Sequence, residues 1–308
     1  MPRASFFHAI RHFSPQGTLE REKLDEYCTA DAAGEGADEM FEYAQRVRRT
    51  IVEVLDEFSS VQFDLKWLCE VVPWMKERQF SIASDPNYLN CSPTRLQLAV
   101  AIVKYKTRLR EPRCGVCTSW FANLPIGSEV PYRIAKGSLR LPPKSETPVI
   151  YIGPGTGVAP MHAFLQQRFA TTQTTEEDGF NGKQDAPPNR IYLGYRHSQK
   201  DFLFESDWRR WSDQGRLEWR LAASRESTDG TKVYVQDRMV EDGEFLWREM
   251  GERGAYVLIS GSAGKMPEAV RAALQQACVT HGGMDEDQAR RYLAIMEAQG
   301  RLQEECWN

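Results

Sequence analysis

One glycine-rich segment has the composition of a phosphate-binding loop. Residues 153–160 read Gly-Pro-Gly-Thr-Gly-Val-Ala-Pro and stand between a predicted strand at 148–153 and a predicted helix at 158–170. Glycines let the backbone approach a pyrophosphate closely, and the first turn of a helix supplies free N–H groups. Val158 replaces the last glycine of the G-x-G-x-x-G pattern, and no Lys-Ser/Thr pair follows as in a Walker loop. The segment predicts a dinucleotide site; the alternative is a tight turn without a ligand.

A hydroxyl group and two cations stand near the end of a later predicted strand. Ser224 and Arg225 follow the apolar stretch that begins at Leu217, and Lys232 comes shortly after. The carboxyl ends of parallel strands face the ligand crevice, so these side chains would meet the ligand there. A phosphomonoester such as the 2′-phosphate of NADP(H), which NAD(H) lacks, suits these donors. On their own they would indicate only a solvated basic edge, and the glycine loop favours the phosphate.

Two further segments could bind a phosphate or a polar ring. Residues 78–84, RQFSIAS, place an arginine and hydroxyls on an extended stretch; the alternative is a charged strand edge with a buried Phe80. Residues 115–118, Gly-Val-Cys-Thr, precede a predicted helix whose first N–H groups could bind a diphosphate, with Thr118 as a candidate cap. The lone Cys-x-x-Cys that ends at Cys117 has no second pair at metal-ligand spacing, so we expect no metal. A small-residue loop is favoured over a redox pair.

The first region that must position these motifs is predicted to be helical. Within residues 1–77, apolar side chains between 38 and 58 recur at helical spacing and predict one buried face. A second stripe of this kind lies near the N terminus and is formed by Phe6, Phe7, Ile10 and Phe13.

Two more regions follow. Residues 78–147 contain β-prone runs at 96–105 and 129–141, which are typical of an antiparallel barrel or sandwich. From 148 onward strands and helices alternate, which predicts βα units and a parallel sheet. Residues 171–189 are polar and predict a loop insertion.

Composition limits the classes of function. A chain of 308 residues is long enough for two domains, and a formal charge of −4 gives no strong attraction for nucleic acid or membrane lipid. No apolar run is long enough to span a bilayer. Seven scattered cysteines without a secretory signal favour a reducing, intracellular compartment. We therefore expect a cytoplasmic enzyme without nucleic-acid or membrane partners; mitochondrial association stays open.

Together these motifs resemble those of the NADPH–cytochrome reductase family of diflavin enzymes. The similarity runs over nearly the whole chain and includes the opening stretches SFF, LEREKL, FEY, RRTI and EVL, which look like the family's helical connecting domain. The resemblance implies a mixed α+β and α/β fold. It predicts a helical connecting domain at 1–77, a partial antiparallel FAD-binding β-barrel at 78–147, and a ferredoxin-reductase-like, doubly wound NADPH-binding domain at 148–308.

The resemblance also implies two groups of cofactor ligands. Those for FAD are Arg48, Arg78, Gln79, Phe80, Ser81, Gly115, Val116, Cys117, Thr118 and Trp307. Those for NADPH are Gly153, Gly155, Thr156, Gly157, Arg196, Ser224, Arg225, Lys232, Val233, Tyr234, Val235 and Gln236. Trp307, which could otherwise fray or pack on the core, would cover the flavin ring.

The implied reaction is hydride transfer from NADPH to FAD. The resemblance assigns it to Ser81, Ser260, Glu305 and Trp307. Electrons would then pass to FMN, if a flavodoxin-like domain is present or separate, or to an iron–sulfur protein of the anamorsin type in cytosolic iron–sulfur assembly.

The chain departs from the family in several places. A flavodoxin-like FMN domain and the first strands of the FAD barrel are expected to be missing. Phe80 stands where relatives often have tyrosine, Ser260 where they have cysteine, and Ala269 where an acidic residue is expected. The alternatives are a stand-alone ferredoxin–NADP reductase-like protein, a sulfite reductase flavoprotein, and a truncated, non-catalytic nucleotide-binding protein.

Overall fold

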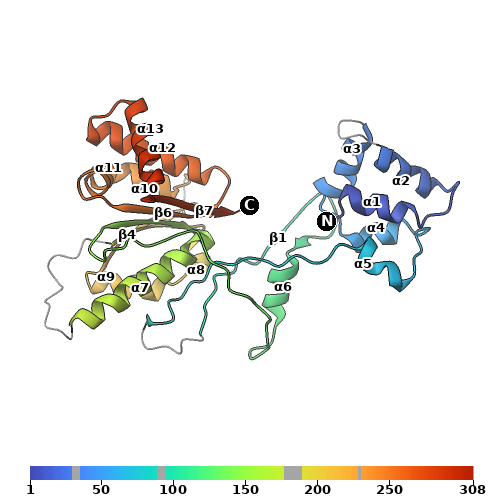
Figure 1. Ribbon diagram of the computed structural model, residues 1–308, viewed down its shortest axis with the longest axis horizontal. Coiled ribbons are helices and arrows are strands. Elements are labelled where there is room, and N and C mark those ends of the chain that lie inside the picture. The colour runs from blue at the N-terminus through green and yellow to red at the C-terminus, as the bar shows by residue number, and fades with distance from the viewer. Residues whose placement is uncertain (30–34, 89–94, 177–188, 228–229, 308) are drawn as a thin grey trace. The chain divides into compact units, whose positions relative to one another are not determined.

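The computed structural model describes residues 1–29, 35–88, 95–176, 189–227 and 230–307 (Figure 1). The chain divides into two compact units. One consists of Met1–Gln79 and Ala101–Glu129, and the other of Phe80–Val100 and Val130–Asn308. The predicted boundaries at 77 and 147 remain predictions.

The first unit is mainly helical, as the sequence predicts for residues 1–77. Its core consists of Phe6, Phe7, Ile10, Leu24, Val54 and their neighbours. The helices are α1 (Ala4–Arg11), α2 (Leu19–Thr29), α3 (Glu35–Met40), a π-helical stretch (Phe41–Arg46), α4 (Ile51–Glu57), a 3-10 turn (Leu65–Trp67) and α5 (Leu68–Val71).

The stretch 38–58 is not one helix, because the chain breaks near its middle. Arg48 has a φ of 60°, in the left-handed region. Thr50 then starts α4 with a capping box, in which its hydroxyl accepts from Glu53 N at 3.1 Å and Glu53 Oε2 accepts from Thr50 N at 2.7 Å. The preceding helical stretch ends at Arg46, and the capping box begins a new helix at Ile51.

The same unit contains two short strands followed by a helix. Strands β1 (Lys104–Tyr105) and β2 (Arg113–Cys114) pair antiparallel, and α6 (Val116–Asn123) follows. In the other unit Ile82 and Leu98 form an isolated antiparallel bridge. The described residues 129–141, predicted as two strands, carry no strand. A β-prone run becomes a strand only where another backbone satisfies its N–H and C=O groups, and no described segment pairs with this one.

The second unit is built on a five-stranded parallel sheet in the order β5-β4-β3-β6-β7. The strands are β3 (Val149–Pro154), β4 (Asn189–Tyr195), β5 (Leu217–Ala223), β6 (Tyr256–Ser262) and β7 (Leu302–Trp307). The sequence predicts the first four. The last, β7, was not predicted as a strand, and the structure shows it as a paired edge strand.

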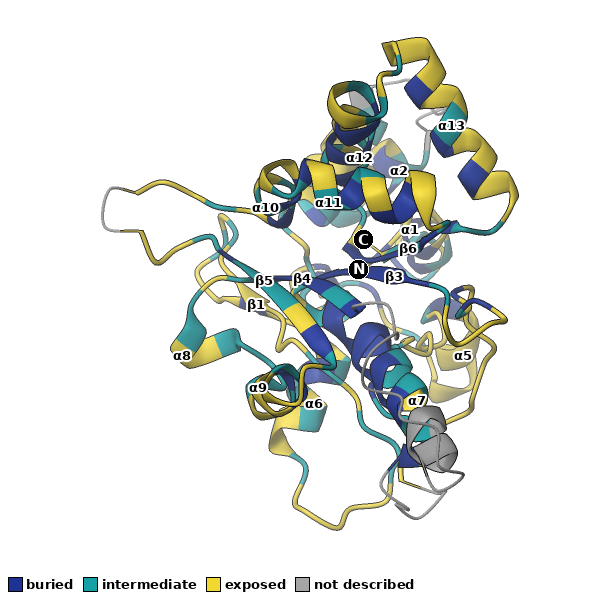
Figure 2. Ribbon diagram, turned by 90° about the vertical axis from the view of Figure 1, so that its left-hand side faces the viewer, coloured by how far each residue is buried: buried dark blue, intermediate teal, exposed yellow. Residues whose placement is uncertain are grey.

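Helices cover both faces of this sheet (Figure 1). One face carries α7 (Val158–Glu176), α8 (Ser198–Asp201) and α9 (Glu205–Asp213); the other carries α10 (Val235–Glu241), α11 (Gly243–Trp247), the π-helical Arg248–Glu252, α12 (Met266–Gly282) and α13 (Glu286–Ala298). The central strands are buried between the two layers (Figure 2). This doubly wound arrangement confirms the predicted fold class.

Helix α7 continues to Glu176 and so takes up the first residues of the predicted loop insertion. The rest of that insertion, 177–188, lies outside the described residues. No helix in the described ranges is long and apolar enough to cross a membrane.

Candidate functional site

The strand order creates a switch point between β3 and β6. From β3 the chain moves outward through β4 to β5 and then returns to β6 on the other side of β3. In open α/β sheets the ligand crevice lies outside the carboxyl ends of the strands at such a point. The glycine loop leaves β3 there, and Ser260 lies at the same edge near the end of β6.

Each of the three positions in the loop requires glycine for a different physical reason. A Cβ at Gly157 would lie 2.0 Å from the backbone oxygen of Ser260, and one at Gly153 would lie 2.9 Å from Val158 Cα. Gly155 has a φ of 59°, a conformation that favours glycine, and a Cβ there would meet nothing within 4 Å. Two glycines therefore permit close backbone packing, and Gly155 keeps the top of the turn open.

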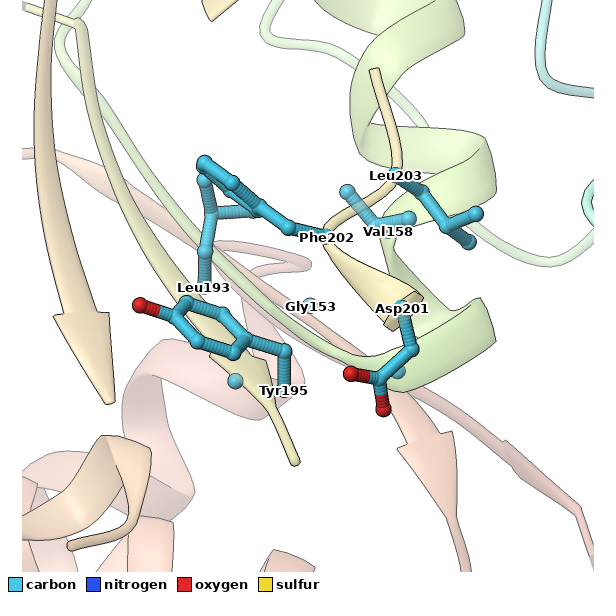
Figure 3. A pocket seen from close by; sticks show the side chains of 9 residues that line it. Gly153, Val158, Leu193, Tyr195, Asp201, Phe202 and Leu203 are labelled. Carbon is cyan, nitrogen blue, oxygen red and sulfur yellow. The ribbon is translucent and has the colours of Figure 1, made fainter. Parts of the chain in front are cut away.

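A pocket lies where the glycine loop meets the end of β4 (Figure 3). The loop is one wall, and Tyr195 with Asp201, Phe202 and Leu203 form another. The Asp201 carboxylate accepts from the backbone N–H of Arg196 at 3.0 Å and of His197 at 2.7 Å. These bonds fix the turn after β4, and with it Arg196. Asp201 was not among the predicted residues, because an aspartate that accepts from backbone N–H groups of a nearby turn has no distinctive sequence signal.

The predicted phosphomonoester ligands lie farther along the same edge. Arg225 N donates to Arg196 O at 3.2 Å, and the Ser224 hydroxyl donates to Tyr195 O at 3.3 Å. These bonds hold the ends of β4 and β5 together, and both Arg196 and Arg225 are exposed.

The remaining members of that set lie around the start of α10, a helix that packs on β4 and β5. Lys232 and Tyr234 are exposed, Val233 and Gln236 are half-buried, and Val235 is buried in the core. The side chain of Val235 therefore packs in the hydrophobic core of this unit. Residues 228 and 229, between Arg225 and Lys232, lie outside the described residues.

The residues assigned to hydride transfer gather at the β6–β7 side of the edge. Ser260 and Glu305 are register partners on adjacent strands. The Glu305 carboxylate accepts from Ser81 Oγ at 3.2 Å, from Ser138 N at 3.1 Å and from Ser138 Oγ at 2.6 Å. Ser260 is fully buried, and within the described structure its Oγ has no hydrogen-bond partner.

Trp307 ends β7 in register with Ser262, and its backbone oxygen accepts from Ala263 N at 2.8 Å. Its side chain is 39% exposed, so the backbone is fixed while the ring keeps access to solvent. Burial raises the pKa of the neighbouring Cys306 thiol to about 11, which keeps that thiol protonated near neutral pH.

The predicted FAD ligands are divided between the two units. Phe80, Ser81 and Trp307 belong to the unit with the parallel sheet. Phe80 is half-buried. Arg48, Arg78, Gln79 and the Gly115–Thr118 turn belong to the helical unit.

In the helical unit, three of these ligands are exposed polar side chains. They are Arg48, whose guanidinium lies 3.7 Å from Met1 Sδ, Arg78, whose guanidinium donates to Lys76 O, and Gln79.

The turn before α6 corrects one prediction. Gly115, not Thr118, is the N-cap, and the helix begins at Val116. The Thr118 side chain lies in the first turn, where its hydroxyl accepts from Val103 N at 3.1 Å and contacts Gly115 O at 3.4 Å. Thr118 is thus buried and ties the turn to the preceding segment, while Val116 is exposed and Cys117 half-buried.

One polar pair, of which only the histidine is buried, was not predicted from the sequence. His162, wholly buried in α7, lies with Nδ1 2.6 Å from Ala83 O and Nε2 2.9 Å from Asp207 Oδ2. The hydrogen bond with His162 is the largest of the effects that hold the pKa of Asp207 below its usual value. A histidine within the apolar stretch VAPMHAFLQQ was the available signal, but its partners lie far away in the sequence.

Comparisons with known proteins agree with this geometry. Residues 1–120 match the family described as FAD binding domain, and residues 151–272 match the oxidoreductase NAD-binding domain. The chain is 44% identical to NADPH-dependent diflavin oxidoreductase 1 of Mycosarcoma maydis, with 100% of the chain and 48% of the relative covered. The proteins of the same name in Xenopus laevis and Mus musculus are 41% and 38% identical, again over 100% of this chain and 48% of the relative. The chain thus spans about half the length of the curated relatives it matches.

Proposed function

We propose that this chain is an NADPH-dependent flavoprotein reductase of the same family as the NADPH-dependent diflavin oxidoreductases to which it is similar. It would take hydride from NADPH onto FAD and pass electrons onward to an FMN domain or an iron–sulfur acceptor. Its NADPH site would be the carboxyl edge of the parallel sheet. The matches to an FAD-binding and an NAD-binding family support both cofactors.

The observation that carries the proposal is the order of residues along that edge. Arg225 follows β5, Arg196 follows β4, the glycine loop follows β3, and Ser260 ends the core of β6. Neighbouring strands are about 4.8 Å apart, so β5 and β6 are separated by about 14 Å. An extended dinucleotide has its adenosine phosphate, pyrophosphate and nicotinamide in this same order. One NADPH molecule could therefore meet all of these groups at once.

The residues present fit NADPH chemically. Gly155 leaves open space above the loop, and the first turn of α7 supplies N–H groups for the pyrophosphate, with Thr156 adding a hydroxyl. Arg225 and Lys232 would pair with the 2′-phosphate, while Ser224, Tyr234 and Gln236 would contact the adenosine. The unpartnered Ser260 hydroxyl, fully buried at the switch point, is a polar group that a bound nicotinamide could satisfy.

The other ligands fit FAD. Arg48, Arg78 and Gln79 offer exposed polar side chains, and the Gly115–Thr118 turn offers the N–H groups of a helix start. When bound, FAD would supply the ring that accepts hydride and releases electrons one at a time.

This chain's own residues would position and gate the reaction. Ser81 and Glu305 are hydrogen-bonded to each other, and Glu305 is further fixed by Ser138, so both would hold a defined orientation toward the nicotinamide. A fixed carboxylate can stabilise positive charge that develops during transfer without reorganisation. Trp307 would cover the flavin and rotate away when NADPH binds, with its backbone still bonded to Ala263.

The onward partner is proposed from the family. The relatives are named diflavin enzymes, which supports FMN as the next carrier. An iron–sulfur protein of the anamorsin type in cytosolic iron–sulfur assembly is the proposed acceptor after that, in the cytoplasm. Electron transfer to such a purified acceptor, with and without an added FMN domain, tests this part separately.

The central test uses the purified chain. We expect a yellow protein with flavin absorption bands that bleach on addition of NADPH and far more slowly with NADH. A chain that folds but stays colourless with added FAD would contradict the flavin proposal. Equal bleaching with both nucleotides would contradict the 2′-phosphate site.

A further inference from the structure

We propose that His162 is a positioning residue that holds the segment Ala83–Asp85 against α7 and thereby orients Ser81 for hydride transfer. The inference rests on the proposed function, because Ser81 matters for transfer only if the chain binds FAD and NADPH. His162 itself lies in the core of the sheet-containing unit and is not assigned to either cofactor.

The tether begins two residues after Ser81. His162 Nδ1 lies 2.6 Å from Ala83 O, and both residues are completely buried. One helical turn later, Gln166 Oε1 accepts from Asp85 N at 2.8 Å. Side chains four residues apart share one face of a helix, so α7 grips the segment at two successive turns.

Both ring nitrogens of His162 have an oxygen partner. Ala83 O can only accept, so Nδ1 is the donor of that bond. Nε2 lies 2.9 Å from Asp207 Oδ2, and the other Asp207 oxygen accepts from Arg210 at 2.8 Å. The hydrogen bond with His162 is the largest of the effects that lower the pKa of Asp207. Each contact restricts the rotation of the ring.

Aromatic side chains fix the plane of the same ring. Phe204 stacks on it with centroids 4.0 Å apart, and Trp208 meets it edge-on at 5.2 Å. Beyond the tether, Tyr88 OH accepts from Trp211 Nε1 at 2.9 Å. The segment after Ser81 is therefore anchored repeatedly to α7 and α9.

The site side of the segment has fewer constraints. Ser81 is tied to the sheet through its hydrogen bond to Glu305, and Ala83 N donates to Gln97 O at 2.8 Å. Releasing Ala83 would let Ser81 and Glu305 shift together, whereas Arg196 and Arg225 depend on the ends of β4 and β5. The inference thus predicts slower hydride transfer with unchanged NADPH affinity.

The test compares two variants with the holoenzyme. His162→Phe keeps a flat ring but removes both ring nitrogens, and His162→Asn keeps a donor near the position of Nδ1. Hydrogen exchange at the Ala83 and Asp85 amides should speed up in His162→Phe, much less in His162→Asn, and not at all in the β6 amides. His8→Phe, at an exposed position in the helical unit, is the matched control.

Stopped-flow flavin reduction by NADPH supplies the second measurement. A misplacement of about 1 Å can lower a rate about a hundredfold, so we expect a ten- to hundredfold slower step in His162→Phe. The Michaelis constant for NADPH should not change, and His162→Asn should recover most of the rate and serve if the phenylalanine variant does not fold. Unchanged exchange would overturn the tether, and faster exchange with an unchanged rate would overturn the positioning role. A wild-type chain that NADPH does not reduce would instead refute the proposed function, and the exchange result would still decide the tether.

Discussion

Two turns in this chain are assigned the same task with very different support. Gly153–Gly157 and Gly115–Thr118 both open a helix and both would bind a diphosphate through its first N–H groups. The first follows a buried six-residue strand and leads into a 19-residue helix. The second follows a two-residue strand and leads into an eight-residue helix.

The neighbours of the two turns differ as well. At Gly157 the limiting atom belongs to the backbone of β6, which the parallel register fixes. At Gly115 the limiting atoms are the side chains of Thr118 and Val103. A turn whose shape is set by backbone contacts is therefore already formed before its ligand binds. A turn whose shape is set by side-chain contacts can adjust to the ligand.

The strongest test of this difference is Gly157→Ala. A Cβ 2.0 Å from Ser260 O cannot be accommodated without separating the glycine loop from β6. We expect a destabilisation of about 3 kcal/mol and an NADPH-dependent rate lowered about a hundredfold or more. Urea unfolding and stopped-flow reduction measure the two effects. Gly264→Ala, where a Cβ meets nothing within 4 Å, is the control, and a Gly157→Ala variant as active as this control would refute the rigid turn.

Arg225→Ala tests the affinity for NADPH and not the rigidity of the glycine loop. A charge-assisted bond to the 2′-phosphate contributes about 1.5–3 kcal/mol, so the Michaelis constant for NADPH should rise about tenfold or more. Values with NADH should barely change, since NADH lacks that phosphate. Steady-state kinetics with both nucleotides decide the matter, with the exposed Arg290→Ala as a control. Equal losses with NADPH and NADH would mean that Arg225 supports the fold instead.

The strands differ in the same way in how well the sequence predicts them. Strands β3, β4 and β6 contain continuous apolar runs, β5 alternates apolar and charged residues, and each was predicted from the βα rhythm. Strand β7, LQEECW, carries two glutamates and gains its identity only by pairing with β6. The run at 129–141 has strand-like residues but no described partner strand. The apolar pattern and the βα rhythm therefore predict β3 to β6, whereas the polar edge strand β7 depends on tertiary pairing.

The residues of the candidate site also fall into two groups, those that the sequence predicts and those that it does not. The glycine loop, Ser224 and Arg225 were recognisable because their chemistry is local to a strand end. Ser138 contacts Glu305 across 167 residues, and His162 contacts Ala83 across 79, so neither contact leaves a local sequence signature. Thr118 was correctly placed near a helix start, but its role as a tether to Val103 depends on that distant partner.

Gly115→Ala is the counterpart to the first test and should have a smaller effect. The added Cβ would lie 2.6 Å from Thr118 Oγ and 2.8 Å from Val103 Cβ, both on side chains. A local rearrangement of about 1 kcal/mol should weaken FAD binding about fivefold and leave NADPH binding to the sheet unchanged. Fluorescence titration of the deflavinated protein with FAD measures this. If Gly115→Ala proved as damaging as Gly157→Ala, the two turns would be equally rigid.

Trp307→Ala tests whether the last strand gates the nucleotide. An aromatic stack contributes about 0.5–1.5 kcal/mol beyond its buried area, so its removal should raise the NADH rate about two- to tenfold. NADPH, whose phosphate contacts already offset that cost, should gain much less. The alanine variant keeps the backbone bond from Ala263, which a deletion of Trp307 and Asn308 would remove. If the ratio of NADH to NADPH rates is the same in both proteins, Trp307 merely packs on the surface.

The smallest expected effect comes from Ser260→Cys, at the strand end that fixes the first turn. The serine hydroxyl is fully buried and has no hydrogen-bond partner among the described residues, an arrangement that costs about 1–3 kcal/mol. A thiol is larger and forms only weak hydrogen bonds. The free energy of unfolding of the variant should therefore be higher by about 1 kcal/mol, which urea unfolding measures. It should also fill the space against the reacting nicotinamide better and speed hydride transfer about two- to fivefold. Stopped-flow flavin bleaching measures the rate, and Ser262→Cys, exposed two residues later on β6, is the control. A rate that is unchanged or slower in Ser260→Cys would show that the buried hydroxyl serves the nicotinamide at least as well as a thiol does. The bound cofactor would then supply the hydrogen-bond partner that Ser260 lacks.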